Sequence, residues 1–188
     1  MLLLDNVTFR REPYPVWGVT DVLPIELYDR LVRSFPPIDS TWAVSKGYNS
    51  KKSLSEVSTA GAYHKWLEYS LPWKQLHHYV KSDAFILDIL ALAARYCVRA
   101  EPSPGVVRSR FEFSAMPADG GCLLPHTDIA SKIFTVVIPI GTDTEWDPAW
   151  GGGTDILEPL NPADNLLDYK AGLDKFCKVC YTSPVATG

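Results

Sequence analysis

Residues 123–140 read LLPHTDIASKIFTVVIPI and contain the most strand-like run of the chain, Ile133–Ile140. This density of β-branched and apolar residues predicts a strand. Just before it, His126 and Asp128 stand two residues apart, and in extended backbone two such residues point to the same face. An imidazole and a carboxylate on one face can bind a single divalent metal ion, and this ligand pair suits iron(II). The stretch therefore predicts a strand with a metal-binding pair at its start.

Length, charge and composition limit the classes of function. The 188 residues suffice for one domain with a substantial core, and a hydrophobic content of 46% is ordinary for a globular protein. The net charge of −4, without any Lys/Arg-rich block, gives no electrostatic reason to expect nucleic acid or an anionic membrane as a partner. The longest apolar stretch, residues 84–94, contains Asp88 and is too short to cross a bilayer.

The N-terminus and the cysteines predict a cytoplasmic location. Met1 to Leu4 are apolar, but Asp5 ends the run and no basic region precedes it, so this start does not resemble a signal peptide. Without a secretory signal, the four cysteines predict thiols in a reducing compartment. Cys177 and Cys180 form a lone CxxC pair. In a strand, residues three apart face opposite sides, so we expect no shared metal there.

The first half of the chain predicts short strands followed by helices. Residues 1–20 predict one or two short strands interrupted by prolines. A helix begins at Pro24, which can occupy a first turn, and ends before Pro36. The polar residues 38–62 predict a long loop, which is either a lid over a binding site or a mobile surface loop. Residues 63–98 predict three helical pieces, of which the second starts with a proline and the third follows a serine cap.

The second half predicts short strands with glycine and proline turns. These strands are Val106–Met116, Ile133–Ile140, Thr154–Pro159 and Lys175–Val185. Gly151 to Gly153 predict a tight turn before the third of them. Helices first and strands afterwards predict an α+β fold, with helices packed on an antiparallel sandwich or barrel.

The surroundings of His126 and Asp128 resemble the Fe(II)- and 2-oxoglutarate-dependent dioxygenases. The matching parts are the strand Arg110–Phe113, the apolar strand Ile133–Ile140 and the glycine-led strand Gly152–Leu157. In this family a double-stranded β-helix, or jelly roll, carries a His-x-Asp…His iron site. The resemblance implies one domain over residues 1–188.

Within that domain, the resemblance implies two parts. Residues 1–104 form a helical front part with N-terminal strands, and residues 105–188 form a partial jelly-roll core. The N-terminal helices would pack on this incomplete double-stranded β-helix. The implied parent activity is hydroxylation of a small-molecule or peptide substrate that the sequence does not identify.

The resemblance also implies roles for individual residues. His126 and Asp128 supply two of the three iron ligands of a facial triad. Arg110, Phe113 and Thr135 are the residues implied for cosubstrate binding. The implied cofactors are Fe(II) and 2-oxoglutarate, with ascorbate as an additional candidate.

The chain departs from the family pattern after Asp128. The histidines of the chain are His64, His77, His78 and His126. None follows Asp128, where the family has a distal His, and no Arg or Lys follows Tyr181 to hold the far carboxylate of 2-oxoglutarate. The upstream histidines predict packing or surface residues.

Two explanations of this departure stay open. The chain is either a C-terminally incomplete oxygenase domain, which we favour, or a natural variant that has lost its site. Both predict weak iron binding or none, and no turnover. The alternative function is a non-catalytic jelly-roll module that binds a ligand or partner, and a cupin-like metalloenzyme with another cofactor is a weaker option.

Overall fold

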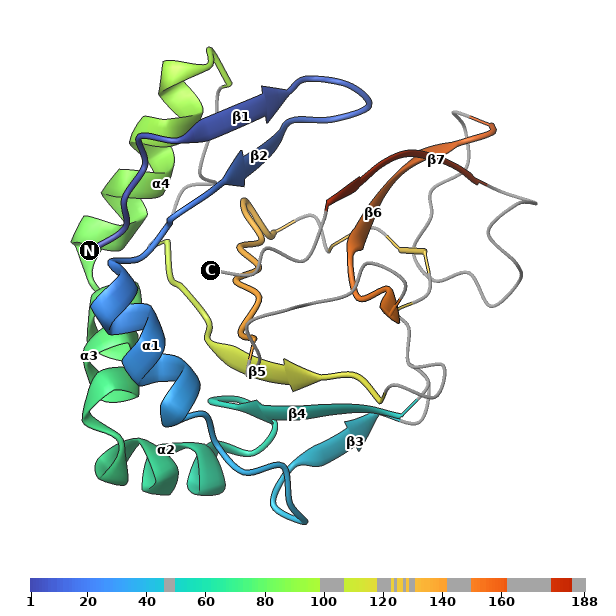
Figure 1. Cartoon of the computed structure of the whole chain (residues 1–188). Helices are drawn as coiled ribbons and strands as arrows, with labels where there is room; N and C mark the ends of the chain where they lie inside the picture. Colours follow the sequence, from blue (N-terminus) through green and yellow to red (C-terminus); the bar gives the residue numbers. More distant parts are fainter. Residues whose placement is uncertain are drawn as a thin grey trace. The chain divides into compact units, whose positions relative to one another are not determined.

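The computed structural model describes residues 1–45, 50–98, 107–117, 123, 125–126, 128, 131–141, 150–161 and 177–183 (Figure 1). The chain divides into two compact units. The first unit is Met1–Leu3 with Asp21–Leu123, and the second unit is Leu4–Thr20 with Leu124–Gly188. The expected boundary at residues 104 and 105 lies outside the described residues.

The described residues confirm the predicted α+β class. They contain four helices and three small antiparallel sheets, and none of these sheets closes into a barrel. The helices all belong to the first unit, together with the three-stranded sheet. Both two-stranded sheets belong to the second unit.

The helices of the first unit are α1 (Ile25–Arg33), α2 (Ala60–Tyr69), α3 (Leu71–Val80) and α4 (Asp83–Arg95). Three of the four begin where the sequence indicates, and α2 begins three residues before the predicted start at Tyr63. Pro24 is the N-cap residue of α1, and Pro72 lies in the first turn of α3. The Ser82 hydroxyl accepts a hydrogen bond from the Phe85 backbone N–H at 3.5 Å and caps α4. Local signals at Pro24, Pro72 and Ser82 therefore predicted the starts of α1, α3 and α4.

The sheet of the first unit corrects one prediction. Its strands are β3 (Ala43–Ser45), β4 (Lys51–Ser55) and β5 (Glu112–Ala115), in the order β3-β4-β5. The long loop predicted for residues 38–62 is wrong, because β3, β4 and the start of α2 all lie in it. The pairing of Leu54 with Phe113 makes β4 a strand. Since that partner lies far away in sequence, local composition could not reveal it.

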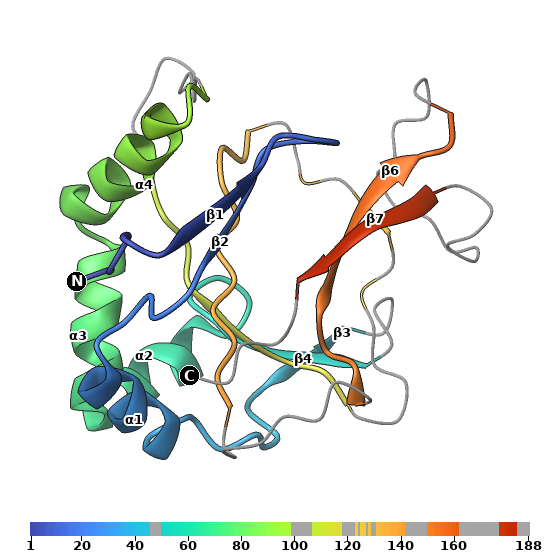
Figure 2. The same ribbon diagram turned by 45° about the horizontal axis from the view of Figure 1, so that its top comes forward.

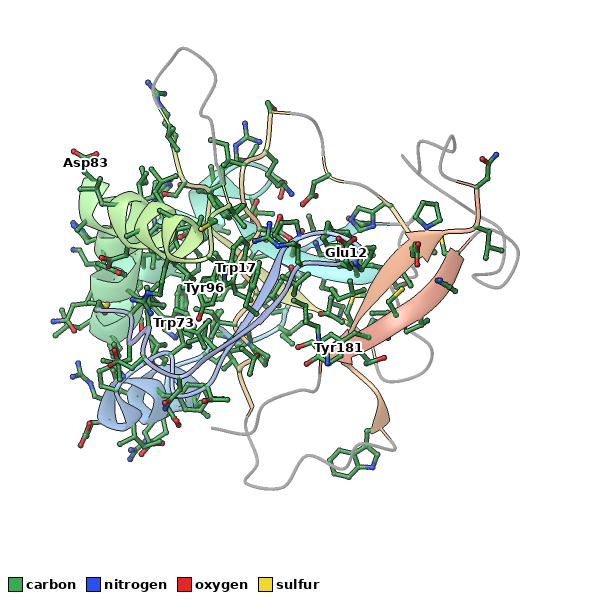
Figure 3. The ribbon with its side chains drawn as sticks, turned by 90° about the horizontal axis from the view of Figure 1, so that it is seen from above. Glu12, Trp17, Trp73, Asp83, Tyr96 and Tyr181 are labelled. Carbon is green, nitrogen blue, oxygen red and sulfur yellow. The ribbon has the colours of Figure 1, made fainter. Side chains whose placement is uncertain are left out.

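Phe113 lies at the centre of an aromatic core in the first unit. It is only 4% exposed, and its ring lies 4.6 Å from the Trp73 ring and 5.2 Å from the Trp66 ring. Phe35 approaches it edge-on at 5.6 Å. Trp73, labelled in Figure 3, also donates its indole N–H to the Leu31 carbonyl at 3.1 Å. Edge-on pairs of this kind contribute roughly 0.5–1.5 kcal/mol each beyond the burial of apolar area.

The second unit holds two antiparallel strand pairs, and Figure 2 shows both. In the first pair β1 (Val7–Arg10) lies against β2 (Val16–Val19), and in the second pair β6 (Thr154–Pro159) lies against β7 (Cys177–Ser183). All four strands match predicted segments. The tight turn before β6 is also confirmed, with φ of 72° at Gly151 and 83° at Gly152, a backbone conformation that favours glycine.

Aromatic contacts link the parts of the second unit. The Trp17 ring lies 5.4 Å from Phe9 and 6.1 Å from Phe134, so the β1–β2 pair packs against the segment 131–141. The Arg10 guanidinium lies 4.3 Å from the centre of the Tyr181 ring on β7, a cation–π contact.

The apolar segment Ile133–Ile140 is not a strand in the structure, which corrects the strongest strand prediction. Among the described residues no strand pairs with it. Val136 and Val137 are 46% and 66% exposed. β-Branched residues favour extended backbone, but a strand also requires a partner for its hydrogen bonds, and Pro139 provides no N–H. The predicted strand Val106–Met116 is likewise shorter, since only Glu112–Ala115 pair, and Val106 lies outside the described residues.

Replacement of the central core ring should strongly destabilise the first unit. We expect Phe113→Ala to lower the free energy of unfolding by about 3–5 kcal/mol, because it leaves a cavity between Trp73 and Trp66. Chemical denaturation followed by tryptophan fluorescence measures this change. Val137→Ala, at an exposed position, is the control and should change the free energy by less than about 0.5 kcal/mol. Equal effects of the two substitutions would contradict the assignment of Phe113 to the core.

Candidate functional site

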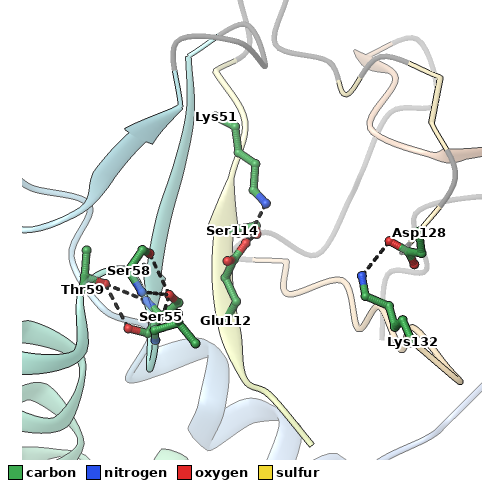
Figure 4. A network of polar contacts seen from close by, with 9 residues as sticks. Lys51, Ser55, Ser58, Thr59, Glu112, Ser114, Asp128 and Lys132 are labelled. Atoms are coloured by element: carbon green, nitrogen blue, oxygen red, sulfur yellow. Dashed lines mark hydrogen bonds and ion pairs between the residues drawn. The ribbon is translucent and has the colours of Figure 1, made fainter. Parts of the chain in front are cut away.

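The site predicted from sequence centres on Asp128 in the second unit. His126 and Asp128 are both exposed and follow the buried Pro125. The Lys132 ammonium donates to Asp128 Oδ1 at 2.6 Å, a contact shown in Figure 4. The Thr135 hydroxyl donates to the other carboxylate oxygen, Oδ2. Each oxygen of Asp128 therefore has a donor from the segment that follows it.

The same neighbours keep Asp128 ionised. Partial burial alone would raise the pKa of this carboxyl group. The hydrogen bonds from Lys132 and Thr135, together with the charges of Lys132 and His126, outweigh that effect and lower the pKa below its usual value of 3.8. His126 is therefore within electrostatic reach of Asp128. At neutral pH the carboxylate is in the form that binds a metal ion.

The residues predicted for cosubstrate binding lie in different units. Thr135 lies with Asp128 in the second unit and hydrogen-bonds to it. Arg110 and Phe113 belong to the first unit. Arg110 is exposed there, whereas Phe113 is buried among aromatic rings.

The available donors match an iron centre only in part. His126 and Asp128 are donor types that iron(II) accepts. Within the ranges that the structure describes, however, no three His, Cys, Asp or Glu side chains are grouped so that they could hold a metal ion. A carboxylate has about four lone-pair positions, so the two donors on Asp128 leave room for a cation. The described residues thus provide candidates for two of the three ligands of a facial triad, and we assign no reaction step to a metal in this chain.

Tyr14 is a neighbour of Asp128 that the sequence did not indicate. It lies in the loop between β1 and β2 and is 48% exposed. Burial raises the pKa of its phenol, the backbone N–H of Leu157 lowers it, and the negative charges of Cys180 and Asp128 raise it further. The phenol therefore lies near the carboxylate and near the β6–β7 pair. No local signal could have found it, because the loop and Asp128 are brought together only by folding.

The three other histidines lie on helices of the first unit. His64 is on α2, and His77 and His78 are on α3. The Nδ1 atom of His77 forms a hydrogen bond of 2.7 Å with the hydroxyl of Tyr63, whose side chain is fully buried. The His64 and His77 rings lie 6.2 Å apart in edge-on geometry. His77 therefore has a packing role, as the sequence predicts.

Burial disfavours the charged forms of this pair. It lowers the pKa of His77, while nearby Glu56 raises it and Lys81 lowers it. Burial also raises the pKa of the Tyr63 phenol well above 10, and the charge of Glu56 adds to this effect. Both groups are therefore neutral in the folded protein near pH 7.

Both cysteines of the CxxC pair lie on β7. Cys177 is buried on β7 and Cys180 is exposed. The Cys180 Sγ lies 3.5 Å from Glu158 Oε2 on the paired strand β6. Cys180 lies at an irregularity of the strand pair, where Ile156 pairs with Tyr181 and Leu157 with Val179, so the regular alternation of faces is interrupted there.

Comparisons with known proteins give no relative for this chain. No protein-family model, no curated protein and no solved structure matches it. In the described part of the chain, no helix has the length and apolar character needed to cross a membrane. A function must therefore be argued from the residues around Asp128 themselves.

The Tyr63–His77 pair predicts a pH dependence of stability. Since folding lowers the pKa of His77, the unfolded chain binds more protons just below the ordinary value of 6.5. The free energy of unfolding should therefore fall as the pH drops from about 7.5 to about 5.5. His77→Gln, which keeps a hydrogen-bonding group, should reduce this slope. Denaturant titrations at several pH values measure it, and His78→Gln, at an exposed position, is the matched control. An unchanged slope in His77→Gln would contradict the assignment.

Proposed function

We propose that this chain is part of an Fe(II)- and 2-oxoglutarate-dependent oxygenase domain, with hydroxylation as the reaction of the complete domain. His126 and Asp128 would provide two iron ligands. The strand pairs of the second unit would belong to a double-stranded β-helix. Under this proposal the chain as given is inactive.

The observation that carries the proposal is the state of Asp128. Its carboxylate is ionised and partly exposed, and it lies within electrostatic reach of His126. Thr135, one of the three residues implied for cosubstrate binding, donates to the same carboxylate. These three residues belong to one compact unit together with the glycine-led strand β6.

The small number of candidate metal ligands supports the expectation that this chain is inactive. Among the residues that the structure describes, no three His, Cys, Asp or Glu side chains are grouped so that they could hold a metal ion. Two donors bind a divalent ion weakly, because a facial triad requires three. In members of the family with a full ligand set, O₂ is the oxidant, and iron and 2-oxoglutarate activate it while 2-oxoglutarate is decarboxylated to succinate. This chain would contribute only the orientation of one imidazole and one carboxylate.

A non-catalytic binding module is the second candidate function. The observation that favours it is the Lys132–Asp128 ion pair, since it gives the carboxylate a structural partner without any metal. Under this alternative Asp128 orders the segment 131–141, and the surface of the second unit binds a ligand or partner. A loss of stability in Asp128→Asn without any metal binding by the unaltered chain would favour this function.

Metal titration tests the proposed oxygenase site. We expect weak Co(II) binding by the full chain in calorimetry, with Co(II) standing in for iron(II) because it resists oxidation. Asp128→Asn and His126→Ala should each abolish this binding, because each removes one of two donors. Asp155→Asn is the matched control, since Asp155 also accepts a threonine hydroxyl, from Thr182 at 2.6 Å, in the same unit.

Turnover provides the second measurement. With Fe(II) and ascorbate, conversion of 2-oxoglutarate to succinate should stay at background. Turnover that Asp128→Asn removes would show that the chain holds a complete ligand set and would overturn its inactive state. Equal loss of Co(II) binding in Asp155→Asn and Asp128→Asn would overturn the proposed site itself.

A further inference from the structure

We infer that Lys132 and Thr135 act on Asp128 in opposite ways: Lys132 competes with a divalent cation for the carboxylate, whereas Thr135 positions it for one. This inference rests on the proposed metal-binding role of Asp128. It concerns two side chains that surround the carboxylate but are not themselves ligands.

The position of Lys132 defines the competition. Its Nζ lies 2.6 Å from Asp128 Oδ1, and the two side chains are 43% and 40% exposed. A divalent ion on the same oxygen would bind at a similar distance, so the ammonium and the metal would be close neighbours of like charge. The ammonium only donates hydrogen bonds and cannot become a ligand while it is charged. Metal binding therefore requires Lys132 to move away from Oδ1.

The exposure of Lys132 makes this competition partial. A side chain that is 43% exposed can turn its charge into solvent when a metal binds. An exposed ion pair contributes only about 0–1 kcal/mol, so the pair can be broken. We therefore expect Lys132 to weaken cation binding without preventing it.

Thr135 acts on the other oxygen and carries no charge. Its hydroxyl donates to Oδ2, which restricts rotation of the carboxylate and leaves the lone pairs of Oδ1 available to a metal. Hydrogen-bonding partners of this kind orient metal ligands, and their removal commonly weakens metal binding. A neutral donor adds this orientation without repelling the ion.

Two substitutions with opposite expected results test the inference. We expect Lys132→Met, which keeps the chain length but removes the charge, to tighten Co(II) binding by about tenfold. Lys132→Arg keeps the charge and should bind Co(II) as the unaltered chain does. Thr135→Val should weaken binding by roughly three- to tenfold. Calorimetric titration of the full chain with Co(II) alone measures all of these values.

The second unit offers a matched control for each change. Lys178→Met removes one cation from a comparable ion pair, in which Lys178 Nζ lies 2.8 Å from Glu158. Thr182→Val removes a threonine hydroxyl that donates to an aspartate, Asp155, at 2.6 Å. Both controls should leave Co(II) affinity within about twofold, since screened charges away from the ion contribute little.

The outcomes separate this inference from the proposed function. Co(II) binding that depends on His126 and Asp128 but is unchanged or weakened in Lys132→Met would overturn the inference and leave the proposed site intact. Equal tightening in Lys132→Met and Lys178→Met would also overturn it, because net charge alone would then explain the effect. No Co(II) binding at millimolar concentration in any variant, Lys132→Met included, would overturn the proposed site and the inference together. Binding that appears only in Lys132→Met would support the competition by Lys132, but it would overturn the expectation that this competition is partial and that the unaltered chain binds Co(II).

Discussion

The pairing of β4 with β5 is the interaction on which the first unit depends. It sets Leu54 opposite Phe113, so that Phe113 can contact Trp73 on α3 and Trp66 on α2. Three helices, α2 to α4, separate β4 from β5 in the sequence. The hydrogen bonds between β4 and β5 therefore join two segments that lie far apart along the chain. The helices in turn bury the apolar face of the sheet. Sheet and helices therefore stabilise each other, because neither can bury its apolar side chains alone.

Local signals in the sequence predicted the elements that depend on local chemistry. Pro24, Pro72 and Ser82 mark helix starts because each acts on its own first turn. The glycines before β6 mark a turn for the same reason, since they permit positive φ. The α+β class follows from the order of such elements and needs no knowledge of their contacts. The jelly roll, by contrast, stays a prediction, because it is defined by strand pairings that local signals do not encode.

The errors share one physical cause, which is that a strand depends on its partner. The sequence of β4, with only one large apolar residue among polar ones, carries little strand signal, yet it pairs with β5. The run Ile133–Ile140 has the strongest signal, yet it joins none of the described sheets. At the candidate site, the spacing of His126 and Asp128 was readable from the sequence. The donors from Lys132 and Thr135 and the approach of Tyr14 were not, because chain folding brings them to Asp128.

The Asp128 carboxylate connects these observations on structure to function. An ionised carboxylate that is partly withdrawn from water needs compensating charge or hydrogen bonds. In a complete iron site the metal supplies that compensation, whereas in this chain Lys132 and Thr135 supply it. These contacts stabilise the metal-free state. The binding energy of a metal must therefore exceed that of the contact between Lys132 and Asp128 which it displaces. Each additional ligand would shift this competition toward the metal, since its binding energy adds to that of Asp128 while the contribution of Lys132 stays the same. A two-donor site with its own ammonium group is thus physically consistent with the weak metal binding that the proposed function predicts.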